Sequence, residues 1–237
     1  MTPDHPLSSA PGARVHGAAI PSSGGDRRAV RLSTPRLRLA PVAADDLEEL
    51  FALHADPAAF RGDTTPPLTD RVQMRWVLGQ WRAVWAREGR GYLTVRAADG
   101  GAVGRTADGG AAGCPGGGTG EPPTGPGGGA GGLPPGLLGV VGVSPLATDD
   151  GPVLSAYWRI APAVQGRGVA TEAMRTVLAA PRLRPRGVEV VAVTARGNEA
   201  SCALADRLGF RPAAATRTVP GGRDGDLLLV LPPEDAP

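Results

Sequence analysis

Apolar residues recur every three to four positions in several stretches of this chain, which is the spacing of an amphipathic helix. The pattern predicts a helix that opens at Asp45 and Asp46, a second over residues 70–88 and a third over 168–180. A shorter helix is predicted from Asn198, a good N-cap residue, to Leu208. The apolar positions behind the longer helices are Leu47, Leu50, Phe51, His54, Met74, Val77, Leu78, Trp81, Trp85, Ala170, Ala173, Met174, Val177 and Leu178.

Other stretches alternate in polarity or are rich in β-branched residues, as strands are. They cover residues 36–39, 92–97, 137–143, 153–160, 188–194, 210–218 and 227–231. The run 188–194 is almost continuously apolar, which is typical of a central strand buried on both faces. This order of strands and helices predicts an α/β domain.

Two segments differ from the rest in composition. Residues 1–30 are rich in Pro, Ser, Gly and Ala without periodicity, and they are predicted to be a disordered tail. Residues 98–136 hold 17 of the 36 glycines and almost no large apolar side chains, which predicts a disordered insertion. Because loop-closure entropy grows only logarithmically with length, a pair of strands can carry such an insertion. We therefore expect one domain over residues 31–232.

Residues 165–172, Gln-Gly-Arg-Gly-Val-Ala-Thr-Glu, join a predicted strand to a predicted helix. Such a turn leaves backbone N–H groups unpaired at the positive end of the helix dipole, where a phosphate binds well. Gly166 and Gly168 have no Cβ to keep an anion away, and Arg167 could add a charged hydrogen bond. A tight connection that binds nothing has the same pattern, so both interpretations stay open.

The spacing narrows the choice of ligand. With Thr171 in place of the last glycine, the segment is not a Gly-x-Gly-x-x-Gly fingerprint, and no P-loop motif is present. Gln165, Gly168 and Ala170 do follow Gln/Arg-x-x-Gly-x-Gly/Ala, which resembles the acyl-CoA pyrophosphate loop of the GNAT N-acetyltransferases. Residues 157–173 resemble the RimJ/RimL-type branch of that family, and Asn198 to Phe210 follow its Asn-x-x-Ser/Ala…Leu-Gly-Phe pattern.

The resemblance implies the GNAT fold, a mixed and largely antiparallel sheet flanked by helices. It implies that acetyl-CoA is the cosubstrate, with no metal, and that a primary amine attacks the thioester directly in a ternary complex. The strand ending at Ile160 and Ala161 would splay from 188–194 and bind the pantetheine arm, with a backbone N–H near Ile160 stabilising the oxyanion. The residues implied to bind the cosubstrate are Ile160, Ala161, Gln165, Gly166, Arg167, Gly168, Val169, Ala170, Thr171 and Asn198.

Proton transfer is less well specified. The family often has a Tyr seven residues after the Asn, where this chain has Ala205. Ser201 matches a position where the RimJ/RimL-type branch often has Ser, so it is the candidate proton donor to the leaving thiolate, or else a surface serine without a role. A thiol with a pKa near 8.5 leaves almost unaided, so loss of the Tyr is tolerable. No base emerges: Asp149, Asp150 and Glu172 have simpler roles in turns and at a helix start.

Three interpretations of function follow. The first is an acetyl-CoA-dependent N-acetyltransferase acting on a protein N-terminus or a small-molecule amine. The second is a catalytically degenerate member that binds acyl-CoA as a sensor or interaction module, as the missing Tyr and base suggest. The third is an enzyme that uses a different phosphate-containing cofactor.

Charge and composition exclude some partners. The net charge of +2 and the dispersed basic residues argue against a nucleic-acid surface, and no signal segment or long apolar run is present. We therefore expect a cytoplasmic monomer or homodimer with no membrane partner. His54 is expected to be a partly buried residue that bonds a backbone carbonyl, with a catalytic base as the alternative. Trp81 and Trp85 are expected in the core, while Trp76 lies off the apolar stripe and is a candidate for a partner or acceptor-substrate surface.

Overall fold

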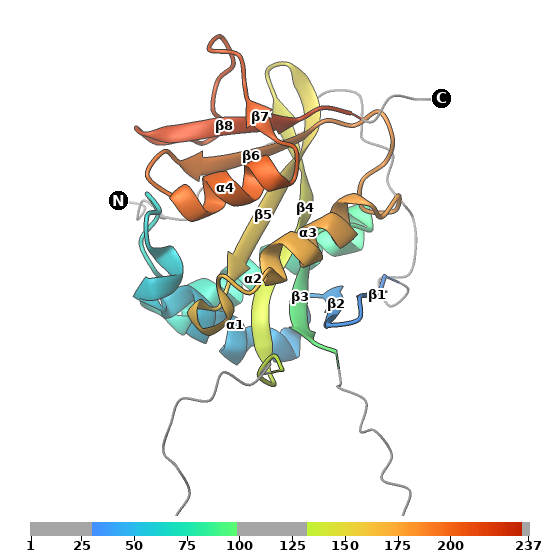
Figure 1. Ribbon diagram of the computed structural model, residues 1–237, viewed down its shortest axis with the longest axis vertical. Helices are drawn as coiled ribbons and strands as arrows, with labels where there is room; N and C mark the ends of the chain where they lie inside the picture. The colour runs from blue at the N-terminus through green and yellow to red at the C-terminus, as the bar shows by residue number, and fades with distance from the viewer. Residues whose placement is uncertain (1–29, 99–131, 234–237) are drawn as a thin grey trace, which may run out of the picture.

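The computed structural model describes residues 30–98 and 132–233, which form an eight-stranded sheet with helices on both faces (Figure 1). The strand order is β1-β2-β3-β4-β5-β6-β8-β7. The elements are β1 (Leu32–Ser33), β2 (Leu37–Pro41), α1 (Leu47–Ala55), α2 (Arg71–Glu88), β3 (Tyr92–Ala97), β4 (Leu137–Thr148), β5 (Gly151–Ile160), α3 (Val169–Leu178), β6 (Val190–Ala195), α4 (Glu199–Arg207), β7 (Arg211–Pro212) and β8 (Asp226–Leu231).

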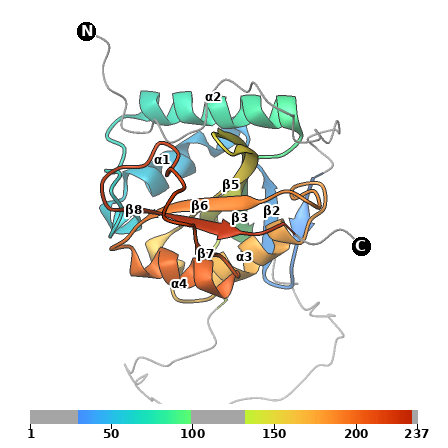
Figure 2. The ribbon, with the colours of Figure 1, turned by 90° about the horizontal axis from the view of Figure 1, so that it is seen from above.

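The predicted fold class is confirmed: the sheet is mixed and mostly antiparallel. Every neighbouring pair is antiparallel except β5 and β6. Helices α1 and α2 cover one face, and α3 and α4 cover the other (Figure 2). The parallel pair follows from the α3 crossover, because a helix is the usual way to connect parallel strands.

The β5–β6 pair opens within the sheet. Its register joins only Leu154 to Val190 and Ser155 to Val191, although β5 continues to Ile160 and β6 to Ala195. On its other side β5 stays paired with β4 as far as Gly139 and Ile160. The two strands therefore splay, as the family resemblance implies, and they leave a gap in the middle of the sheet.

Helix α2 begins and ends with defined caps. The Asp70 side chain accepts a hydrogen bond from Val72 N at 2.8 Å, and Gly89 closes the helix at a φ of 64°. Trp81 and Trp85 are buried in the core, as their helical spacing predicts. Trp85 Nε1 donates to Tyr92 O at 2.7 Å, which ties the helix to β3.

Two predicted strands differ from the observed ones by five residues or more in length. β4 reaches Thr148 because residues 144–148 pair with the start of β5 across the turn at Asp149 and Asp150. The predicted strand 210–218 is wrong beyond β7: Arg217 N donates to Ala214 O in a turn, and the Arg217 guanidinium binds Asp150 and Glu189. These side-chain contacts come from distant segments, so local propensity does not reveal them.

The predicted tail (1–30) and insertion (98–136) lie mostly outside the described residues and stay predictions. At their borders Val30 is buried, and Ala98 N donates to Arg36 O at 2.7 Å. None of the helices described here has the length and apolar character to cross a bilayer.

Candidate active site

The larger of the two cavities described below has a volume of about 1120 Å³ and lies where the splayed strands β5 and β6 meet α3 and α4. Nine of the predicted site residues line it: Ile160, Gln165, Gly166, Gly168, Val169, Ala170, Thr171, Asn198 and Ser201. Ala161 and Arg167 were also predicted, but they are not among the lining residues. The structure thus brings together most of a site whose members are spread over more than forty positions of sequence.

The corner between β5 and α3 is rich in unpaired backbone donors. Gly166 and Gly168 have φ values of 73° and 77°, a region that strongly favours glycine. The first helical bond of α3 runs from Glu172 N to Gly168 O at 3.0 Å. Across residues 30–98 and 132–233, the amides of five residues in this corner find no acceptor: Gly166, Gly168, Val169, Ala170 and Thr171.

Arg36 holds this corner from the far edge of the sheet. Its Nε and Nη2 donate to Glu172 Oε2 at 2.8 and 2.5 Å, and its Nη1 donates to Arg167 O at 3.2 Å. Thr34 Oγ1 donates to the other oxygen of Glu172. Glu172, which the sequence suggests as a dipole partner, is therefore also an anchor for β1 and β2. Arg167 turns away from the cavity, with Nη2 directed at Gly132 O at 3.3 Å.

The two predicted residues at the end of β5 differ in where their amides point. Ala161 N donates to Leu138 O at 2.8 Å, so it belongs to the β4 side. Antiparallel strands alternate between bonded and non-bonded pairs, so Ile160, opposite Gly139, directs its N–H toward the gap. By the same alternation Trp158 N–H also faces the gap, where β6 is no longer paired.

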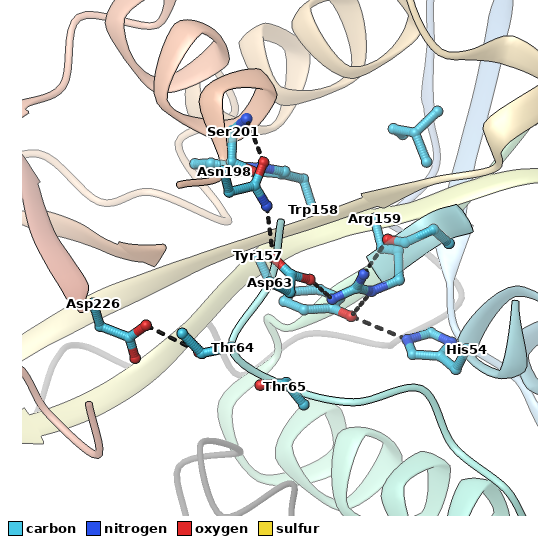
Figure 3. A network of polar contacts seen from close by, with 12 residues as sticks. His54, Asp63, Thr64, Thr65, Tyr157, Trp158, Arg159, Asn198, Ser201 and Asp226 are labelled. Carbon is cyan, nitrogen blue, oxygen red and sulfur yellow. Dashed lines mark hydrogen bonds and ion pairs between the residues drawn. The ribbon is translucent and has the colours of Figure 1, made fainter. Parts of the chain in front are cut away.

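Asn198 is an N-cap and a link to a distant loop. Its Oδ1 accepts from Ser201 N at 3.0 Å, as predicted for a capping residue, and its Nδ2 donates to Asp63 Oδ1 at 2.6 Å (Figure 3). Asp63 Oδ2 accepts from Arg159 Nη2 at 2.8 Å. Gly62 lies against Asn198 with a φ of 82°, and an added Cβ would come within 3.1 Å of its Cα. The α1–α2 loop therefore crosses the gap at the start of α4.

Ser201 lies one turn into α4 and faces β5. Trp158 Nε1 donates to Ser201 Oγ at 3.2 Å. Because an indole can only donate, the serine oxygen accepts this bond and keeps its own proton for another acceptor. The geometry suits a hydroxyl that gives a proton away.

A second cavity of about 180 Å³ lies between the sheet and the α1–α2 layer. It shares a wall with the larger one, formed by Asp63, Ala156, Tyr157, Arg159, Val193 and Thr194. The Thr194 hydroxyl in this wall is buried without a hydrogen-bond partner in the described part of the chain. An unpaired buried hydroxyl is costly, so a polar ligand group is its natural partner.

His54 lies in the floor of the second cavity and is only 3% exposed. Its Nδ1 contacts Leu50 O at 2.7 Å and its Nε2 contacts Tyr157 Oη at 3.0 Å. The predicted bond to a backbone carbonyl is confirmed. Burial, and then the nearby positive charge of Arg159, lower the pKa of His54 from 6.5 to about 4.

Comparison with known proteins agrees with this geometry. Residues 130–211 match the family model described as an acetyltransferase (GNAT) domain. A solved structure from Bordetella pertussis, assigned to the GnaT-family acetyltransferases, is 25% identical, with a TM-score of 0.58 over 85% of this chain and 98% of that one. The chain therefore has the GNAT fold, and its residues 130–211 match the acetyltransferase domain of that family.

Two further solved structures share this fold at lower identity. One, from Vibrio cholerae, is assigned as a ribosomal-protein-serine acetyltransferase, with 17% identity, a TM-score of 0.52, and coverage of 88% of this chain and 100% of that one. The other is a phosphinothricin acetyltransferase from Sinorhizobium meliloti in complex with acetyl-CoA, with 16% identity, a TM-score of 0.51, and coverage of 84% and 89%.

Several residues that line the two cavities could not be identified from the sequence. Asp63 lies in a loop between helices, and Arg36 lies in the bend between β1 and β2, far in sequence from the glycine turn; neither belongs to a motif. Tyr157 and Arg159 do alternate on β5, which indicates one shared face of the sheet, but not that His54 is beside them. Trp76, the predicted acceptor candidate, is 50% exposed on α2 and lines neither cavity described here.

Proposed function

We propose that this protein is an acetyl-CoA-dependent N-acetyltransferase that acts on a primary amine. The observation that carries the proposal is the cluster of unpaired amides at the start of α3, opening into a cavity of about 1120 Å³. Acetyl-CoA, when bound, supplies an acetyl thioester as the acyl donor. The chain's own residues would bind the cosubstrate, orient the amine and transfer protons.

Charge around the larger cavity supports a ligand with several phosphates. Five basic residues line it, Arg36, Arg61, Arg159, Arg175 and Arg207, against the acidic residues Asp63 and Glu172. A diphosphate at the start of α3 would accept from amides of Gly166, Gly168 and the first turn, and the helix dipole favours it there. Gln165 Nε2 donates to Ile160 O at 3.0 Å, which holds the loop against β5 while leaving its amides clear.

Backbone N–H groups in the gap between β5 and β6 would bind the reactive end of acetyl-CoA. Ile160 N–H would stabilise negative charge on the acyl oxygen, and Trp158 N–H would pair with the pantetheine arm. Ser201 would give its proton to the departing thiolate, because Trp158 occupies one of its lone pairs. Asn198 would border the cofactor mainly through its position, since both ends of its amide already have partners.

The second cavity is proposed to receive the amine. Its wall is shared with the first, so an amine there and an acyl group in the gap would meet across β5. Two acids, Asp63 and Asp226, are balanced by Arg159 and Arg223, which does not favour a polycation such as an aminoglycoside. A volume of about 180 Å³ favours a compact amine or a single N-terminal residue. The resemblance to the RimJ/RimL-type branch points to the same class of acceptor.

The proposal is tested by binding and turnover together. Thiol release is measured with acetyl-CoA and a panel of amines that includes peptides with N-terminal Ala and Ser, and CoA affinity is measured by calorimetry. Turnover on at least one acceptor is expected. Tight CoA binding without turnover on any acceptor would instead indicate the acyl-CoA-binding module, and competition by NAD or ATP rather than CoA would indicate a different cofactor.

Gly168 offers a matched pair of variants for the anion site. Gly168→Ala and Gly168→Glu carry the same backbone strain, because both place a side chain at a φ of 77°. The added Cβ would lie 3.5 Å from Arg36 Nη2, which is an ordinary contact. Only the glutamate brings a carboxylate to the site, so its CoA affinity should fall at least roughly tenfold below that of the alanine variant, a loss of about 1.4 kcal/mol. Equal CoA affinity in the two variants would reject the site.

A further inference from the structure

A chain of hydrogen bonds with one direction runs along the wall of the second cavity. A carbonyl oxygen only accepts, so the 2.7 Å contact to Leu50 O places the proton of neutral His54 on Nδ1. His54 Nε2 is then an acceptor, and Tyr157 Oη, 3.0 Å away, must donate to it. Arg159 Nε donates to the same phenol oxygen at 3.0 Å (Figure 3). Tyr157 therefore has one lone pair left for a ligand.

The carboxylates near this cavity are already engaged. Asp63 accepts from Asn198 with one oxygen and from Arg159 with the other. Asp226 accepts from Thr64 Oγ1 at 3.0 Å and from Arg223 N at 2.9 Å. Each of these two carboxylates therefore already accepts from two donors, one on each oxygen.

We propose that Tyr157 is the catalytic residue that takes the proton from the attacking amine, with His54 as the next proton acceptor. The inference rests on the proposed acetyl transfer. Tyr157 lines both cavities, so it belongs to the wall that the amine and the acyl group would share. Its remaining lone pair would accept an amine N–H and so aim the nitrogen lone pair at the gap.

The step balances as follows. The nitrogen lone pair forms the new C–N bond, and the C–S bond breaks with its electron pair going to sulfur. One proton passes from nitrogen to the Tyr157 oxygen while the original Tyr157 proton passes to His54 Nε2. Sulfur receives one proton through Ser201 from solvent, and His54 returns its proton through Tyr157 to solvent, so the enzyme ends unchanged.

The surroundings of His54 suit a transient acceptor. Arg159 on β5 lies near both rings, Tyr92 on β3 packs against Tyr157 with ring centroids 5.2 Å apart, and Asp63 is paired with Arg159. Because burial and Arg159 lower its pKa to about 4, His54 is neutral at neutral pH and is a weak base that holds a proton only briefly. The same effect makes the imidazolium give its proton back quickly.

The two tyrosines of the chain provide a matched pair of variants. Tyr157→Phe removes the relay hydroxyl, and Tyr92→Phe removes a buried hydroxyl beside it that bonds Ser144 instead. We expect Tyr157→Phe to lower kcat roughly 10²-fold or more, with KM for the amine and CoA affinity changed less than about threefold. Its rate should also rise more steeply with pH than that of the wild type, because hydroxide then replaces the relay. Tyr92→Phe should keep kcat within about threefold.

A second readout needs neither turnover nor a variant. Nitrogen NMR of histidine-labelled protein should show His54 as the neutral tautomer with the proton on Nδ1, and its Nε2 resonance should shift when the acceptor amine is added to the CoA complex. Protonated Nε2, or no shift at saturating amine, would overturn the proposal, as would equal losses of kcat in the two tyrosine variants. If the wild type turns over no amine, the proposed function is rejected instead. The His54 tautomer can still be measured in that case, because the NMR experiment does not depend on turnover.

Discussion

The buried histidine on α1 makes the stability of the fold depend on pH in a predictable way. His54 is neutral, with Nδ1 bonded to Leu50 O, and a protonated imidazolium would lie in a buried site near the Arg159 guanidinium. Lowering the pH from neutral toward 4 is therefore the perturbation to examine. The matched variant is His54→Asn, which removes the titrating group and keeps an N–H donor on the side chain.

The magnitude follows from the two pKa values. The unfolded chain takes up a proton at the ordinary pKa of 6.5, whereas the folded protein does so only at about 4. Between these values the unfolded state binds more protons, so the free energy of unfolding falls as the pH falls, and it is fully retained above 6.5. A difference of about 2.5 units at 1.36 kcal/mol each amounts to about 3 kcal/mol, with a slope approaching 1.4 kcal/mol per pH unit.

Urea denaturation at a series of pH values measures this directly. The wild type should lose about 3 kcal/mol between pH 6.5 and 4 beyond whatever His54→Asn loses over the same range. Carboxylates such as Glu49, whose pKa the Arg96 ion pair lowers, contribute equally to both proteins and cancel in the comparison. Parallel curves for the two proteins, whatever their offset, would refute the argument that His54 is buried in its neutral form.

Three further predictions concern stability. Asp63→Asn leaves the Arg159 guanidinium, whose side chain is 10% exposed, without its carboxylate, so the free energy of unfolding should fall by about 3 kcal/mol in urea denaturation, and a loss below about 1 would contradict this. Trp85→Phe removes the bond to Tyr92 O and opens a void, which should cost about 2–4 kcal/mol by the same assay, and an unchanged midpoint would count against it. Replacing residues 99–131 with a short Gly-Ser linker should change the free energy of unfolding by less than about 1 kcal/mol, because Arg96 and Leu137 are already paired across β3 and β4. A protein that no longer folds would show that the insertion is structural.

Sequence pattern predicts the helices of this protein well because their apolar stripes are long. The second helix is predicted over 70–88 and observed as Arg71–Glu88, with Asp70 as its cap. The run 92–97 is observed as β3 without change. The failure at 210–218 has a different cause, since the turn there depends on the Arg217 ion pairs with Asp150 in the β4–β5 turn and with Glu189 just before β6.

The glycine turn is the part of the site that sequence alone determines. The need for positive φ at Gly166 and Gly168, and for free amides at the start of α3, is local and therefore readable from eight consecutive residues. The direction of the Ile160 amide is not local, because it depends on which side of β5 pairs with β4. Nothing in the residue types distinguishes Ile160 from Ala161 before that register is known.

The proposed proton-transfer groups are brought together by the tertiary structure alone. His54, Asp63 and Tyr157 come from a helix, a loop and a strand, and each has an ordinary explanation in its own segment. Their proposed role depends on contacts between residues about one hundred positions apart, such as His54 with Tyr157. Periodicity records which face of an element is apolar, and a spacing motif records backbone geometry within one turn. Neither carries the distance between side chains on different elements, which only the packed sheet and helices define.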